Sequence, residues 1–364
     1  MTQPDPPNGF DGSYDTAAGG MRPPQRPPQP PPGRAPIHTN FTATPADATT
    51  GQQSVRTPGA DELGLIRDGK TIPRRGWRRR LHRWSGGAVN PGESAAESTS
   101  RALADCVNQP VRGSYSIAVL SLKGGVGKTA TTIGLGATLA TLRGDRVIAI
   151  DANPDFGTLA QRGPNQTRST VRDLLADGKI LRYSDIRRHT SQGSNRLEIV
   201  ASERDPAVSE AFSEDDYRAV HRILDRYYNI ILTDCGTGLT HSAMKGVLDT
   251  ADALIVVASP AVDSARSALA TLDWLRHHGY AGLASAATVV VSSARPGAMP
   301  VNLDKLTGYF ESRVRAVVVI PYDEHLAEGG EISLDLIGRK ARQAYMKLAV
   351  SVADALGDRD TGHR

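Results

Sequence analysis

A glycine-rich segment with two lysines carries the clearest chemistry in this sequence. Residues 121–129 read Ser-Leu-Lys-Gly-Gly-Val-Gly-Lys-Thr, between an apolar run and a helical pattern. Glycines let consecutive backbone N–H groups turn toward phosphate oxygens, and the positive end of a helix dipole adds to the attraction. The spacing predicts that Lys128 binds the outer phosphates of a nucleotide and that the Thr129 hydroxyl binds Mg²⁺. The expected nucleotide-binding residues of this segment are Lys123, Gly124, Gly125, Val126, Gly127, Lys128, Thr129 and Ala130.

The segment departs at one position from the general phosphate-loop pattern G-x-x-x-x-G-K-[ST]. That pattern has glycine where this chain has Leu122, and a second lysine, Lys123, follows at once. The arrangement Lys-Gly-Gly-x-Gly-Lys-Thr resembles the deviant Walker A motif of the ParA/MinD ATPases. The resemblance implies that Lys123 reaches the phosphates of a second subunit, so that two chains form a homodimer around ATP. ATP hydrolysis is then expected to be slow until the dimer assembles, because the second subunit supplies a stabilising cation.

Two acidic motifs follow later apolar runs, where the same family places carboxylates. One begins at Asp151 and reads D-A-N-P-D, and the other begins at Asp234 and reads D-C-G-T-G. A carboxylate at a strand end is suited to hold Mg²⁺, so we expect Asp234 beside Thr129. The resemblance also implies that Gly238 approaches the γ-phosphate and that Asp151 and Asn153 position the attacking water.

Asn153 bears on whether the chain turns ATP over. The water-activating residue of the family is the second aspartate of D-x-D, and this chain has Asn153 there. An amide orients water but does not accept its proton as a carboxylate does. Asp151 or Asp155 could act instead, and the sequence does not decide between them. A module that binds ATP with little or no hydrolysis is therefore an alternative to an ATPase.

The residues around the base match the family only in part. The family reads adenine with an asparagine after a late strand, where this chain has two serines, Ser292 and Ser293. Pro321, after the following strand, matches the family's proline loop beside the base. The expected ligand is ATP with Mg²⁺; this expectation rests on the resemblance, since the local residues leave adenine and guanine both open.

The elements that must position these residues alternate along the chain from about Tyr115. Continuous apolar strands joined by helical segments are typical of a doubly wound, mainly parallel α/β sheet that is covered on both faces. The expected strands are 116–120, 146–150, 197–201, 229–233, 253–258, 288–291 and 316–320, and the expected helices are 128–143, 214–228, 242–249, 263–278, 303–310 and about 335–356.

The first hundred residues differ in composition from the rest. Fifteen of the 23 prolines lie before residue 101, which predicts a disordered proline-rich tail over residues 1–72. Such a tail is either a docking segment for a partner or a plain spacer. Residues 73–100 read as a basic segment and a linker, residues 101–357 as the ATPase domain, and residues 358–364 as a polar tail.

The basic segment has an aromatic face. Trp77, Leu81 and Trp84 are spaced i, i+4 and i+7, which places them on one side of a predicted helix within residues 73–87. Five arginines surround this stripe. Such a helix suits anionic lipid headgroups, an acidic protein groove or a nucleic-acid backbone, and it could also pack on the chain's own domain.

Charge and composition narrow the other possibilities. The net charge is only +4, and six arginines lie between Arg74 and Arg83, so the domain is nearly neutral. A DNA partner is therefore not expected, although a chromosome or plasmid partitioning ATPase remains an alternative function. The two cysteines, Cys106 and Cys235, are expected to be free thiols. We find no signal peptide and no apolar stretch of bilayer length, which predicts a cytoplasmic protein with peripheral membrane contact as an open alternative.

The order of the segments points to a narrower group. A proline-rich tail, then G-W-R-R-R and N-P-G-E-S, then this ATPase domain resembles the EspI-like ATPases of mycobacterial type VII (ESX) secretion loci. The D-x-N and D-C-G-T-G variants are similar to those of that group. The resemblance implies a nucleotide switch that regulates or assists secretion, and residues 1–100 are expected to recruit a secretion-machinery protein at the inner membrane surface.

Overall fold

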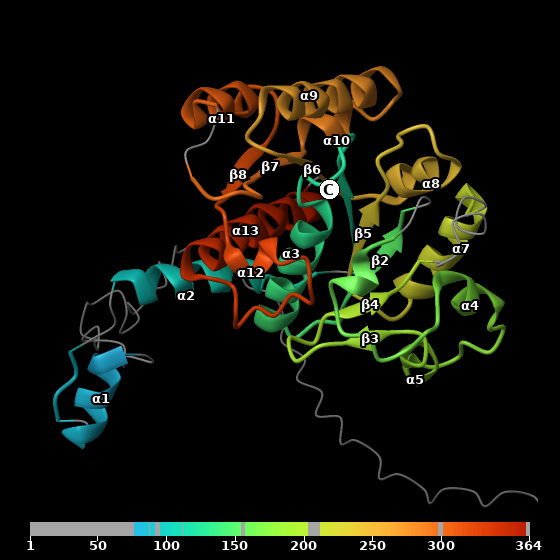
Figure 1. The fold of residues 1–364 in the computed structure, drawn as a ribbon. Helices are drawn as coiled ribbons and strands as arrows, with labels where there is room; N and C mark the ends of the chain where they lie inside the picture. The colour runs from blue at the N-terminus through green and yellow to red at the C-terminus, as the bar shows by residue number, and fades with distance from the viewer. Residues whose placement is uncertain are drawn as a thin grey trace, which may run out of the picture. The chain divides into compact units, whose positions relative to one another are not determined.

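The computed structural model describes residues 76–86, 88–91, 95–111, 113–153, 157–202, 212–297 and 301–361 (Figure 1). The chain divides into two units, residues 1–68 and 69–364, and all of the described residues belong to the second. The proline-rich tail predicted for residues 1–72 lies outside the described residues, and so do Asp155 and residues 362–364.

An eight-stranded sheet forms the centre of the fold, in the order β3-β4-β2-β5-β1-β6-β7-β8. All neighbouring strands are parallel except β3, which runs antiparallel to β4 at one edge. This confirms the predicted doubly wound, mainly parallel α/β fold. The strands are β1 (Tyr115–Leu120), β2 (Val147–Ala152), β3 (Ser191–Gln192), β4 (Glu198–Val200), β5 (Ile230–Cys235), β6 (Ala253–Ala258), β7 (Thr288–Ser292) and β8 (Ala316–Ile320).

Helices cover both faces of this sheet, because successive side chains of a strand point to opposite sides. In β1, Ile117 and Val119 pack into one hydrophobic core, and Ala118 and Leu120 pack into the other. The first core is covered by α2 (Ala95–Val107), α3 (Lys128–Leu142) and α13 (Arg339–Thr361), with the short η1 (Leu159–Gln161). The second is covered by α4 (Val171–Ala176), α5 (Tyr183–Arg187), α7 (Glu214–Asp225), α8 (Ser242–Thr250), α9 (Val262–His277), α10 (Ala281–Ser285) and α11 (Leu303–Glu311).

The structure differs from the sequence prediction at the two ends of the domain. Residues 95–100 were predicted as linker, but they form the start of α2, which packs against α3 and α13 and buries Val107. The helix predicted from about residue 335 begins at Arg339, because residues 333–337 form a turn in which Ser333 O accepts hydrogen bonds from two backbone N–H groups. The same helix runs to Thr361, so residues 358–361 of the predicted polar tail are helical.

A separate short helix, α1 (Gly76–Trp84), forms within the basic segment, as predicted. Another short helix, α12 (Glu324–Ala327), follows β8. Among the described residues, we find no helix that combines the length and the apolar character needed to cross a membrane.

The strand order brings the carboxyl ends of β1, β2 and β5 together at the middle of the sheet. Strand β5 lies between β2 and β1, so Asp234 pairs in register with Asp151 on one side and with Val119 on the other. Open parallel sheets bind ligands at such a point, where successive connections leave in opposite directions. The topology therefore gathers the loops that follow three strands at one edge.

Helix α3 packs unusually closely against α13, since Gly134 lies directly beneath the ring of Tyr345. A Cβ atom at Gly134 would lie closer than 3.0 Å to the ring atoms. Tyr345 is 1% exposed, and its hydroxyl donates to the Ala130 carbonyl at 3.1 Å. Because glycine has no side chain, position 134 leaves room for the Tyr345 ring, and the hydroxyl of that ring binds the first turn of α3.

We expect Gly134→Ala to lower the free energy of unfolding by about 1–3 kcal/mol, because the buried ring has no open space to enter. Urea denaturation followed by circular dichroism measures the change. The matched control is Gly308→Ala in α11, where a Cβ would meet nothing within 4 Å. That substitution is expected to leave stability unchanged or to raise it by up to about 1 kcal/mol. Equal effects of the two substitutions would contradict the close packing.

Candidate nucleotide-binding site

The glycine-rich segment forms a tight loop between β1 and α3. The loop begins where Ser121 Oγ donates to the Lys123 carbonyl at 3.0 Å and accepts from the Lys123 N–H at 3.2 Å. Gly127 directly precedes the first residue of α3. Its φ is 92°, a backbone conformation that residues with a Cβ rarely adopt. A Cβ there would also lie 2.8 Å from Ser292 Oγ at the end of β7. The loop therefore has the left-handed glycine geometry that turns backbone N–H groups toward an anion.

The other residues of the loop lie around this turn. Gly125 also has positive φ, at 72°, and Val126 is 3% exposed and packs into the core beneath α3. Gly124 has open space around its Cα. Ala130, in the first turn of α3, contributes the carbonyl held by Tyr345. Val126 is therefore the buried apolar anchor of the loop, whereas Gly124 and Gly125 are exposed.

Three donors from α3 meet on one buried carboxylate, that of Asp234. Lys128 Nζ lies 3.0 Å from Oδ1, and Thr129 Oγ1 donates to Oδ2 at 2.6 Å. Thr132 Oγ1 donates to Oδ1 at 3.4 Å. Asp234 is 1% exposed, so its charge is compensated by these groups and not by water. The predicted neighbours Lys128, Thr129 and Asp234 thus lie together.

Asp151 lies beside Asp234 on the neighbouring strand and is also 1% exposed. Its carboxylate accepts hydrogen bonds from the backbone N–H of Asn153 at 3.1 Å and of Leu159 at 2.9 Å. A Cβ at Gly157 would lie closer than 3.0 Å to the carboxylate of Asp151. The side chain of Asp151 therefore fastens both ends of the loop that follows β2.

Burial and the nearby charge of Asp234 raise the pKa of Asp151 to about 7 from the ordinary 3.8. Both effects act against the charged form, since desolvation and a second carboxylate each disfavour ionisation. Asp151 therefore holds its proton to a higher pH than a solvent-exposed aspartate does.

The loop after β2 also brings a hydroxyl that the sequence motifs did not indicate. Thr158 Oγ1 lies 3.1 Å from Thr129 Oγ1, next to the Asp234 carboxylate. No spacing rule pointed to Thr158, because it is placed by the fold of a loop and not by a motif. Asn153 begins this loop and is partly exposed, whereas Asp155 lies outside the described residues.

Lys123 does not reach Asp234 and forms an ion pair with Asp263 in the first turn of α9 instead. The Lys123 side chain is 44% exposed, against 12% for Lys128. The pKa of Asp263 lies below its ordinary value because of the Lys123 ammonium and the Ser264 N–H. The two lysines of the loop therefore differ: Lys128 points inward to the site, and Lys123 lies at its exposed rim.

The ends of β7 and β8 adjoin the loop on its other side. The Ser293 N–H donates to the Ile320 carbonyl at 3.0 Å, which brings Pro321 next to the residues that follow β7. Among the described residues, Ser293 Oγ is buried without a hydrogen-bond partner. The serines found in place of the expected asparagine thus lie beside Pro321, but nothing here identifies a base.

The loop after β5 completes the site. Cys235 is buried directly after Asp234, where burial raises the pKa of its thiol, and it donates to the Thr233 carbonyl at 3.5 Å. This agrees with the prediction of a free, packed thiol. Gly238 lies further along, exposed and with open space around its Cα. Its approach to a γ-phosphate stays a prediction.

The residues present fit a nucleotide with Mg²⁺. Within the part of the chain that the structure describes, no group of three or more His, Cys, Asp or Glu side chains could hold a metal alone. A hydroxyl and one carboxylate, from Thr129 and Asp234, are the oxygen ligands that Mg²⁺ takes when phosphates and water supply the rest. The left-handed glycines and Lys128 provide donors for the phosphates.

Comparison with known proteins agrees with this geometry. Residues 114–276 match the family model described as an AAA domain. The fold is similar to that of a ParA family ATPase from Chlorobium tepidum TLS, with a TM-score of 0.55 and 18% identity over 65% of this chain and 98% of that one. It is also similar to the septum site-determining protein MinD of Pyrococcus horikoshii OT3, solved with Mg-ADP, with a TM-score of 0.52 and 22% identity over 68% and 98% of the two chains.

The fold is similar to that of the ParA/MinD ATPases, and the two-lysine loop resembles their phosphate loop. The chain is also similar to EspI, the ESX-1 secretion-associated protein of Mycobacterium tuberculosis, with 40% identity over 287 residues. The match covers 78% of this chain and 43% of EspI, so the chain corresponds to less than half of that protein's length.

The pKa of Asp151 makes stability depend on pH. Because the folded chain keeps a proton that the unfolded chain releases above about pH 4, the nucleotide-free, Mg²⁺-free protein should lose up to about 4 kcal/mol of stability between about pH 4 and pH 7. Asp151→Asn cannot ionise and should flatten this slope, as urea unfolding at a series of pH values would measure. Asp263→Asn is the control: the pKa of Asp263 is shifted downward, so the slope should stay as in the wild type. An unchanged slope in Asp151→Asn would disprove the assignment.

Proposed function

We propose that this chain is an ATP–Mg²⁺-dependent nucleotide switch that forms a homodimer around ATP and regulates or assists a type VII (ESX) secretion system. The observation that carries the proposal is the meeting of Lys128, Thr129 and Asp234 at the end of β5, below a loop of left-handed glycines. The similarity to EspI supports the link to secretion. The protein acts in the cytoplasm, and residues 1–100 recruit a secretion-machinery protein.

Each residue of the site has a distinct part in this proposal. The backbone of the loop and Lys128 bind the phosphates, and the Thr129 hydroxyl and the Asp234 carboxylate hold Mg²⁺. Bound Mg²⁺ supplies positive charge that stabilises the transferred phosphoryl group. Lys128 Nζ lies 3.0 Å from the Asp234 carboxylate and compensates part of its charge. Asp151 positions the loop that carries Asn153.

Lys123 makes the site depend on a second copy. Its side chain is directed to Asp263 at the rim and not to the Asp234 carboxylate, and it is 44% exposed. A cation in this place is available to an adjoining subunit, and a cation added to a phosphoryl-transfer site from outside stabilises charge in the transition state. Pairing with Asp263 holds Lys123 in one orientation in the single chain.

Asn153 favours one second candidate, a chain that binds ATP and changes shape without useful turnover. An amide stands where the family has its water-activating carboxylate, and the nearest described carboxylate, Asp151, is committed to two backbone N–H groups. This candidate shares the nucleotide site and the dimer with the first, and differs only in the chemical step.

Two lysine substitutions test the proposal. Lys128→Ala should abolish ATP binding measured by calorimetry, because it removes the cation that faces the phosphates. Lys123→Ala should keep ATP binding, but it should lower phosphate release by roughly a hundredfold or more and weaken the ATP-dependent dimer seen by light scattering. In the host cell, both variants should alter export through the ESX system. Unchanged ATP binding in Lys128→Ala, with the fold intact by circular dichroism, would refute the site.

The substitution Asn153→Asp separates the two candidates. If the chain hydrolyses ATP slowly, a carboxylate at residue 153 should raise phosphate release by about tenfold or more over a measurable wild-type rate. If it is a binding module, the wild type should release no phosphate beyond the Lys128→Ala background. Asn195→Asp, a substitution in the loop before β4, controls for added charge and should leave the rate unchanged.

A further inference from the structure

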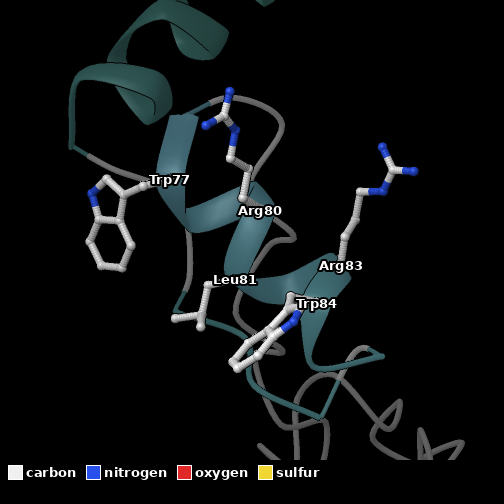
Figure 2. A pocket seen from close by; sticks show the side chains of 5 residues that line it. All are labelled: Trp77, Arg80, Leu81, Arg83 and Trp84. Carbon is white, nitrogen blue, oxygen red and sulfur yellow. The ribbon is translucent and has the colours of Figure 1, made fainter.

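Helix α1 has a narrow apolar face formed by three residues. With 100° between successive residues, Trp77, Leu81 and Trp84 fall within an arc of about 60°. The indoles of Trp77 and Trp84 are 66% and 89% exposed, and Leu81 is half-buried between them. Figure 2 shows the three side chains on the same side of the helix. The face is therefore presented to solvent.

Arginine side chains border this face. Arg80 and Arg83 line the same shallow hollow as Trp77, Leu81 and Trp84, and they project from the adjoining side of the helix (Figure 2). Arg79 is exposed as well. The sequence from residue 73 to residue 91 contains no Asp or Glu, so no carboxylate of this segment offsets the positive charge. The hollow thus combines an apolar floor with a cationic border.

The helix has a defined end and does not continue into a longer element. Gly86 has φ of 61°, which stops the helix, and Ser85 Oγ accepts from the Val89 N–H at 3.1 Å and donates to the His82 carbonyl. His82 Nδ1 also lies 3.1 Å from the Val89 carbonyl. A helix of nine residues is about 14 Å long, too short to cross a bilayer core of roughly 30 Å. If it meets a membrane, it must lie in the interface.

We propose that α1 is an interfacial anchor that binds the surface of a membrane containing anionic lipids. Trp77, Leu81 and Trp84 enter the boundary between headgroups and acyl chains, where indole rings are favoured. Arg80 and Arg83 bind lipid phosphates, for which the planar guanidinium is well shaped. This inference concerns α1 alone and does not depend on the ATP site.

Two features favour a lipid surface over other anionic partners. The exposed indoles stand at the two ends of a single face, as expected of a helix lying flat on a plane, whereas a nucleic-acid backbone offers no apolar phase for them. Arg80 and Arg83 line the hollow together with the apolar residues, so cationic and apolar groups lie on adjoining sides of the helix. An acidic protein groove is an outcome that the experiment below can reveal.

Flotation of the full-length chain with lipid vesicles tests the anchor. The protein should float with vesicles of equal parts phosphatidylglycerol and phosphatidylcholine and remain unbound with phosphatidylcholine alone. Replacing Trp77 and Trp84 by Ala should reduce the bound fraction more than tenfold. Each change of Arg80 or Arg83 to Gln should weaken partition roughly fivefold, and added salt should weaken the wild type.

The control variant loses exposed apolar side chains elsewhere. Leu181 and Leu336 are 81% and 66% exposed outside α1, and the double substitution Leu181→Ala/Leu336→Ala should float like the wild type. Circular dichroism confirms that each variant retains its fold. Equal loss of flotation in the control and the Trp variant would overturn the assignment to α1.

Tryptophan fluorescence gives an independent readout. Trp274, the remaining tryptophan, stacks on His278 with ring centroids 4.0 Å apart, so Trp274→Phe leaves Trp77 and Trp84 as the only indoles. Their emission should shift to shorter wavelength with anionic vesicles and be quenched by brominated acyl chains. Absence of both the shift and flotation would overturn the proposal, as would binding of an acidic peptide or DNA through α1 without any binding of vesicles.

Discussion

The buried charge of Asp234 is the interaction on which the site depends. A carboxylate that is 1% exposed must be compensated by nearby donors, and α3 supplies all three that the structure records, Lys128, Thr129 and Thr132. Asp151 places a second buried carboxyl group in register with the first, and its raised pKa keeps it from adding a full second charge at acidic pH. The first turn of α3 must therefore face the end of β5, and the glycine loop allows the chain to enter the helix at that position.

Charge in this chain is organised locally. The net charge of +4 describes neither the site nor the surface, because six arginines lie in or next to α1 while the domain is nearly balanced. The site attracts an anion through oriented N–H groups, one inward lysine and a helix end, none of which requires an excess of positive charge. The arginines of α1 act through their number, because together they create a positive electrostatic potential around one short helix.

The sequence predicted the parallel sheet, the loop and its meeting with Asp234, because each depends on local spacing or on the shared edge of parallel strands. Lys123 and Lys128 differ by only five positions, yet their opposite environments were not predictable from spacing, since Asp263 lies 140 residues further along the chain. Thr158 and the contact between Gly127 and Ser292 were missed for the same reason. The start of α2 was not predicted because residues 95–100 include no large apolar side chain; the helix as a whole packs on α3 and α13.

The ring of Tyr345, which α13 places against Gly134 of α3, has a consequence for the order in which the protein is made. The phosphate loop and α3 leave the ribosome long before α13, which follows every strand of the sheet. Until α13 emerges, the face of the sheet that includes Ile117, Val119 and Ile255 has α3 but lacks the cover of α13, and the Ala130 carbonyl lacks the Tyr345 hydroxyl. The apolar residues that α13 covers must therefore be kept from self-association until α13 is made, and the loop between β1 and α3 gains its full support only when synthesis of the domain is nearly complete.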